Sequence, residues 1–314
     1  MKNRLLIIAF LSASLAPMVL RAEEYGSGHY MPGAMASFAD VPPTNNALIY
    51  LNMFTFYGGD ATASQTFQLG GSLALNVEAS VYADTSVILY QTPWTILGGR
   101  YGMGLAIPYV WMDVKGNVQK DNRSIRSEDR ANGIGDIEAL PLVLEWKSGD
   151  VSYGACLGVY MPTGEFDRKD LANIGKNYWT FEPCAHVSWL SSKIGTEASL
   201  FSGFDVSTKN EDTDYQSGNV FHLDGTLAQH FPLLGGFAGA GVTGFYYKQV
   251  TADSGSGAKL GDFEGRTMGV GPVVSHVMKI GKTDVMAEAK WLREFDAEKR
   301  LEGDLIWVKV AVAF

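Results

Sequence analysis

The sequence lacks the features on which several classes of protein depend. Beyond its first 22 residues it has no apolar run near the ~20 residues that a membrane helix needs, so any membrane span must be made of strands. No long segment shows clean helical periodicity. The formal charge is −9 with no basic stripe, so we expect no nucleic-acid partner. The sequence also has no nucleophile elbow and no clustered metal-ligand spacing, so we expect no enzyme activity, no cofactor and no metal.

The first residues are typical of a secretory signal peptide. Lys2 and Arg4 precede an apolar stretch over residues 5–16, and Ala22 offers a small residue for cleavage. We predict a signal peptide over residues 1–22, although Leu20 is larger than the residue usually found three positions before a cut. The mature chain is then exported through the inner membrane.

The last eleven residues predict an amphipathic strand. Ile306, Val308, Val310, Val312 and Phe314 share one face at period two, and Leu305, Trp307, Lys309, Ala311 and Ala313 share the other. A strand that is apolar on one face and ends in Phe resembles the insertion signal of bacterial outer-membrane barrels. We expect it to contact outer-membrane lipid and to bind the barrel-assembly machinery through Phe314. A buried last strand of a soluble sandwich is the alternative.

Candidate strands follow one another along the chain without helices between them. They cover residues 46–57, 72–91, 99–117, 133–147, 151–162, 177–191, 195–208, 217–231, 237–250, 264–280, 283–296 and 304–314. Most are long enough to cross a bilayer at the ~45° tilt of barrel strands. The links after even-numbered strands are short, and those after odd-numbered strands are longer and more charged, as in outer-membrane barrels. We predict an all-β fold, a transmembrane antiparallel up-and-down β-barrel of about 12 strands over residues 46–314, with both termini in the periplasm.

Residues 23–45 precede the first strand and follow no regular pattern. Gly28, Pro32, Gly33 and the pair Pro42 and Pro43 exclude a long helix or strand. Two interpretations stay open for this segment, a disordered periplasmic leader and a plug that folds into the mouth of the barrel.

The alternation of polar and apolar residues predicts which side chains face the lumen. Over 177–191, for example, Trp179 and Phe181 alternate with Thr180 and Glu182. The lumen candidates are Arg100, Glu182, His186, Glu197, Asp205, His222, Asp224, Glu288, Lys290 and Lys309. Such a network of mixed charge either braces the interior or selects the solute. On two strands Glu145 and Arg293 break the alternation, which predicts a β-bulge or a misplaced boundary at each.

His222 and Asp224 lie two residues apart on one face, as half of a hydrolytic or metal site would. No nucleophile or ligand spacing supports that interpretation. An outer-membrane lipid-modifying enzyme stays an alternative, but it needs its histidine on the outer surface of the barrel.

The two cysteines fall on neighbouring predicted strands. In the antiparallel pairing of these strands, opposed residues have numbers that sum to about 340, and 156 plus 184 is 340. Opposed β-carbons are ~4.5–5.5 Å apart, close to the range of a disulfide. Because the periplasm is oxidising, we predict a bridge between Cys156 and Cys184, with two unpaired small residues as the alternative.

Several short motifs occur in a fixed order along the mature chain. They are Gly28-His29-Tyr30-Met31-Pro32-Gly33, Val41-Pro42-Pro43, Gly133-Ile134-Gly135-Asp136, Pro162-Thr163-Gly164-Glu165-Phe166-Asp167, Lys176-Asn177-Tyr178-Trp179 and Tyr215-Gln216-Ser217-Gly218. Together they resemble the phenol meta-pathway (MetA-type) outer-membrane family. The resemblance implies a channel or transporter for uptake of a small hydrophobic or aromatic solute. The motifs are signatures of turns and packing, so no binding residue carries over, and a non-transporting structural or binding barrel is the alternative.

Overall fold

The structure is a computed structural model that describes residues 27–61, 66–69, 72–120, 123–260, 264–281 and 283–314. Its strands are β1 (Ala47–Asp60), β2 (Thr66–Leu69), β3 (Ser72–Ile96), β4 (Gly99–Lys120), β5 (Arg123–Ile134), β6 (Ile137–Ser148), β7 (Val151–Met161), β8 (Thr180–Leu190), β9 (Thr196–Ser207), β10 (Val220–Leu233), β11 (Gly236–Gln249), β12 (Arg266–Ile280), β13 (Thr283–Glu298) and β14 (Glu302–Ala313). One 3₁₀ turn, η2 (Phe38–Asp40), precedes them.

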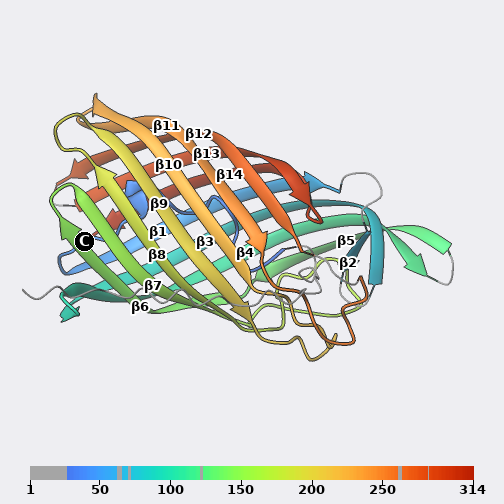
Figure 1. Ribbon diagram of the computed structural model, residues 1–314. Helices are drawn as coiled ribbons and strands as arrows, with labels where there is room; N and C mark the ends of the chain where they lie inside the picture. Colours follow the sequence, from blue (N-terminus) through green and yellow to red (C-terminus); the bar gives the residue numbers. More distant parts are fainter. Residues whose placement is uncertain (1–26, 62–65, 70–71, 121–122, 261–263, 282) are drawn as a thin grey trace, which may run out of the picture.

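The strands form one antiparallel sheet that closes on itself (Figure 1). β1 pairs with β3 on one side and with the last strand, β14, on the other. β2 and β5 pair only with the outer parts of β3 and β4, so twelve of the 14 strands make the ring. Closure gives the backbone groups of every wall strand a partner on both sides, as a barrel in hydrocarbon requires. The predicted twelve-stranded all-β barrel is confirmed.

The two ends of the barrel differ, as the lengths of the links predict. Tight turns at 97–98, 149–150 and 234–235 lie at the end where β14 finishes, which we call the turn end. The connections over 162–179, 208–219 and 250–260 lie at the other end, the loop end. Among the described residues, no helix is long and apolar enough to cross a membrane.

The outer face of the wall is apolar. On β14 the side chains of Ile306, Val308 and Val310 are 38–42% exposed, whereas Trp307 and Lys309 are 5% and 3% exposed. The two faces predicted for this strand are therefore correct, with Trp307 inside. Other strands present Tyr, Trp, Leu and Ile outward in the same way. An apolar outer surface with a polar inner one is the pattern of a barrel in a membrane.

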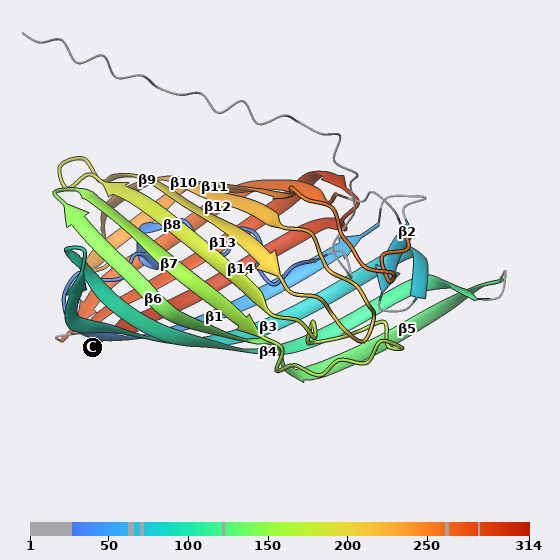
Figure 2. The same ribbon diagram turned by 60° about the horizontal axis from the view of Figure 1, so that its bottom comes forward.

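The predicted loop over residues 118–132 is mostly strand. β4 continues to Lys120 and β5 returns from Arg123, so a hairpin extends the wall beyond the loop end (Figure 2). Residues of opposite charge face each other across the two strands of this hairpin. For example, Nε of Arg130 lies 2.7 Å from a carboxylate oxygen of Asp113. This hairpin was not predicted, because its charged residues pair across the two strands in water and leave no apolar face to mark a strand. β2 likewise lies inside the predicted loop 58–71.

Both strands with a predicted irregularity carry a register shift. The β6–β7 register shifts between Ala139 and Leu142, and this bulge turns the side chain of Glu145 inward, where it is 1% exposed. On β13 the register with β12 shifts between Phe295 and Glu298, just beyond Arg293. Arg293 itself lies on the outer face near the loop end, where its guanidinium pairs with the carboxylate of Asp304 at 3.1 Å.

Cys156 and Cys184 are directly opposed on β7 and β8 and form a disulfide with a Cα–Cα distance of 4.9 Å. We expect denatured, unreduced protein to show no reactive thiol, and two after reduction. Replacing both cysteines by Ser is expected to cost about 3–4 kcal/mol, because the bridge restricts the unfolded chain over a separation of 28 residues. Two reactive thiols without reduction would contradict the bridge.

Candidate functional site in the barrel lumen

Residues 27–46, which we name the lumen segment, run through the inside of the barrel (Figures 1 and 2). At the loop end the ammonium of Lys176 donates to the carbonyl of Ser27 at 2.8 Å. At the turn end the guanidinium of Arg100 donates to the carbonyl of Thr44, just before β1, also at 2.8 Å. The described part of the N-terminal segment therefore lies inside the barrel and is held at both of its ends.

This path bears on the prediction of two periplasmic termini. β1 begins and β14 ends at the same end of the barrel, where the backbones of Leu48 and Phe314 are hydrogen-bonded. Ser27 lies at the opposite end, because the lumen segment crosses the whole barrel. A periplasmic C-terminus stays a prediction, and residues 1–26, with the predicted signal peptide, lie outside the described residues.

The carboxylate of Asp136 anchors the loop end of the lumen segment. It lies 2.9 Å from Nε2 of His29 and accepts backbone N–H bonds from Gly164 at 2.9 Å and Lys176 at 2.7 Å. The other ring nitrogen of His29 contacts the hydroxyl of Thr180 at 2.8 Å. Four of the sequence motifs therefore meet at one buried carboxylate, which explains residues that looked like separate turn signatures.

The middle of the lumen segment is held by β10 and β13. The hydroxyl of Tyr30 donates to the carboxylate of Asp224 at 2.5 Å, and the backbone N–H of Met35 donates to the same group at 3.1 Å. The Tyr30 ring stacks on His222 with a centroid distance of 3.6 Å. From β13, Lys290 donates to the carbonyl of Met35 at 2.8 Å. Charged wall residues thus satisfy backbone groups that have no strand partner.

Near the turn end the contacts centre on η2. Ser37 caps this turn, and its backbone N–H donates to Asp40. Asp40 then pairs with the ammonium of Lys309 at 2.5 Å, and Lys309 also lies 3.3 Å from the carboxylate of Glu288. The N–H of Phe38 donates to Glu197 at 2.7 Å. These contacts are charge-assisted and buried, so they are among the stronger ones a segment of this kind can make.

All ten predicted lumen residues lie on the inner side of the barrel, and their contacts divide them into two groups. Five form a hydrogen bond or an ion pair with the lumen segment: Arg100, Glu197, Asp224, Lys290 and Lys309. The other five form ion pairs within the wall: Glu288 with Lys290, His186 with Glu145 at 3.0 Å, and His222 with both Glu182 and Asp205. The ring of His222 also stacks on Tyr30 of the lumen segment. This arrangement braces the interior, as one of the two predicted roles requires. Solute selection by these residues stays a prediction.

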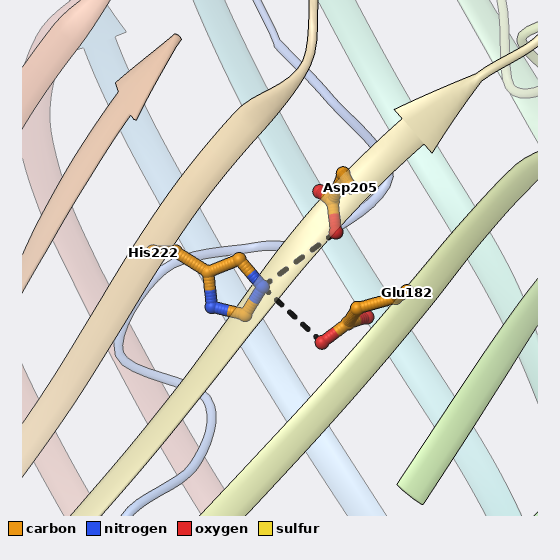
Figure 3. A group of neighbouring side chains, drawn as sticks. All are labelled: Glu182, Asp205 and His222. Atoms are coloured by element: carbon orange, nitrogen blue, oxygen red, sulfur yellow. Dashed lines mark ion pairs between the residues drawn. The ribbon is translucent and has the colours of Figure 1, made fainter. Parts of the chain in front are cut away.

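His222 and Asp224 do not form a catalytic pair. The carboxylate of Asp224 faces Tyr30 and Met35, whereas Nε2 of His222 faces Glu182 and Asp205 (Figure 3). The interpretation of these two residues as half of a hydrolytic site therefore has no geometric support.

Five residues that hold the lumen segment in place, or belong to it, were not predicted as site residues from the sequence: His29, Tyr30, Asp40, Asp136 and Lys176. Asp40 lies in the irregular segment and has no local signal. The other four lie within the short sequence motifs. The clustering of polar residues in those motifs was the one signal that could have marked them as site residues.

A small cavity lies between the lumen segment and strands β8 and β9. It has room for about one water molecule and is lined in part by Ser37, Asp40, His186 and Phe201. A solute larger than water does not fit in this cavity while the lumen segment is in place.

Comparisons with known proteins agree with this architecture. A family model described as "Putative MetA-pathway of phenol degradation" matches residues 58–310. Among solved structures, an outer membrane channel from Pseudomonas putida F1 is similar with a TM-score of 0.58 and 13% identity, over 91% of this chain and 100% of that one. The beta domain of the Bordetella autotransporter Brka is similar with a TM-score of 0.50 and 10% identity, over 86% and 100%. No curated protein matches. At these identities the structures show a shared outer-membrane barrel fold.

Proposed function

Because this chain belongs to the family described as the MetA pathway of phenol degradation, we propose that it is an outer-membrane channel for small hydrophobic or aromatic compounds. The lumen segment is its gate. The observation that carries this proposal is a closed twelve-stranded ring whose interior is filled by a separate, polar-anchored segment. Rings of ~8 strands are filled by their own side chains and rings of ~16 leave an aqueous channel, so twelve strands suit a narrow path.

Aromatic side chains of the wall support the class of solute. Phe201, Phe245, Tyr247 and Trp307 are inward-facing, buried and grouped with Tyr30 of the lumen segment. When the lumen segment moves, Tyr30 leaves this group and the four wall rings line the path. Flat apolar rings offer a large contact area and stacking geometry to an aromatic solute.

The uptake test compares a deletion strain with its parent on a panel of aromatic carbon sources at limiting concentration. We expect slower growth on at least one aromatic source and equal growth on succinate, because entry across the outer membrane limits only the apolar substrate. A plasmid copy of the gene should restore growth. Equal growth on every source, together with no solute flux through the purified protein in liposomes, would overturn the proposal.

A non-transporting structural barrel is the second candidate. The observation in its favour is that contacts hold the lumen segment along its full length, from Lys176 to Arg100. Such a barrel would stay closed whatever solute is present. The conductance experiment described in the Discussion separates the two candidates.

A further inference from the structure

Glu182, Asp205 and His222 form a compact cluster on three adjacent strands, β8, β9 and β10 (Figure 3). Nε2 of His222 lies 3.2 Å from a carboxylate oxygen of Glu182 and 3.6 Å from one of Asp205. All three ligand atoms lie within 4.8 Å of one another, and the three residues are 0–3% exposed. The hydrogen bonds described above between the wall and the backbone of the lumen segment come from other residues.

The charges of the cluster balance only if one carboxylate takes up a proton or a further cation binds. Two carboxylates and one imidazolium leave a net charge of −1 in a buried place. Glu138 adds a third carboxylate nearby, because a β-carbon placed on Gly158 would lie 2.7 Å from an oxygen of Glu138 and 3.5 Å from one of Glu182. Buried charge without compensation is costly. A divalent cation with two carboxylates and a neutral imidazole brings the three-residue cluster to zero.

The geometry points the same way. Two ligand atoms that are each ~2.0–2.1 Å from a tetrahedral zinc ion are about 3.3 Å apart, close to the spacing between Nε2 and the two carboxylates. Within the described part of the chain, Nε2 of His222 makes no hydrogen bond of regular angle although the residue is 0% exposed. Nε2 of His222 is therefore buried and faces the carboxylates of Glu182 and Asp205, but it forms no hydrogen bond of regular geometry with either.

A glycine lies in the wall beside Nε2 of His222 and the carboxylate of Glu182. Gly203 pairs with His222 across β9 and β10. A β-carbon at this position would lie 2.3 Å from Nε2 of His222 and 2.6 Å from the oxygen of Glu182. Glycine at position 203 therefore lets Nε2 of His222 and the oxygen of Glu182 approach each other.

Neighbouring groups orient two of the ligands. The hydroxyl of Tyr160 donates to the second oxygen of Glu182 at 2.9 Å, and the ring of Tyr30 lies against the imidazole of His222. Partners of this kind fix ligand orientation in metal sites. The contact with Tyr30 also places the cluster next to the lumen segment.

We propose that Glu182, Asp205 and His222 bind one divalent transition-metal ion, with Zn²⁺ as the ion best matched to one imidazole and two carboxylates. The three residues supply three ligands, and a tetrahedral ion keeps its fourth position for water. The site ties β8, β9 and β10 together behind Tyr30. This inference is independent of transport, because it concerns binding alone.

The test is zinc binding by the full mature protein, purified in detergent without a histidine tag and stripped with a chelator. Isothermal titration with Zn²⁺ and metal analysis after desalting are expected to give one ion per chain. His222→Gln is expected to weaken binding by about 100-fold or more, and Tyr160→Phe by about 10-fold. His230→Gln is the matched control, since His230 is another buried histidine facing one acid, Glu197, at 2.7 Å, and this variant should bind zinc as the wild type does.

Each result decides the proposal. Stripped wild-type protein that retains no zinc, or His222→Gln and Asp205→Asn variants that bind as tightly as wild type, would overturn it. Heat-modifiable migration in gels reports whether each variant has folded. If His222→Gln does not fold, the wild type and Asp205→Asn carry the test.

Discussion

Mature protein that lacks residues 23–44 is expected to conduct ions in planar bilayers far more than the intact mature protein. The lumen segment runs along the inside of the ring from Ser27 to Thr44, and a cavity beside it holds about one water molecule. If the segment is in place about 99% of the time, its removal raises the mean conductance on the order of 100-fold. The wall keeps its strand pairing, since β1 begins at Ala47. Single-channel recording and liposome swelling measure the change.

A peptide of residues 27–46 provides the control. Added to the shortened protein, it is expected to lower the conductance again, whereas a peptide with the same residues in scrambled order should not. Conductance of the shortened protein no higher than that of the intact one would show that the wall closes the lumen by itself. That result favours the structural barrel over the channel.

Replacing Lys309 with Met is expected to release the turn-end half of the lumen segment. The ammonium lies between Asp40 and Glu288, and the side chain is 3% exposed. Removing one partner of a buried ion pair costs about 3–5 kcal/mol because the other charge stays buried. The segment can avoid this cost by taking Asp40 into water, so the variant should open more often and resist denaturant less. Conductance and urea denaturation measure the two effects.

Two further variants test the cause. Lys309→Met combined with Asp40→Asn is expected to recover part of the lost stability, because Asp40 then leaves no unpaired charge and Glu288 still pairs with Lys290. Lys209→Met is the matched control, since Lys209 pairs with Asp214 and Glu211 in a loop open to water. Unchanged closure in Lys309→Met would show that this ion pair does not hold the gate.

The wall could be predicted from sequence because strand alternation is local. Glu182 and His222 were assigned inward from their immediate neighbours, and both are buried. Trp307 lies inside for the same reason, although tryptophan often lies at membrane interfaces. The hairpin of β4 and β5 was not predicted, because its strands have no apolar face and are paired through opposite charges instead.

The lumen segment could not be placed from sequence, because its contacts are remote. His29 lies 107 residues from Asp136, Tyr30 lies 194 from Asp224, and Asp40 lies 269 from Lys309. The alternation of polar and apolar residues along a strand carries no information about contacts between residues so far apart in the sequence. The register of the two cysteine-bearing strands, by contrast, follows from one antiparallel pairing and could be worked out by arithmetic.

The route of the lumen segment constrains how this protein can assemble. The pairing that shuts the ring joins β1 to β14, the first and last strands of the wall. Residues 27–46 run directly into β1, yet their far end lies at the opposite mouth. If the ring closed first, residues 27–46 would have to pass through the whole lumen from the turn end. We expect instead that the segment lies along the growing sheet when β1 and β14 pair, so that the ring closes around it.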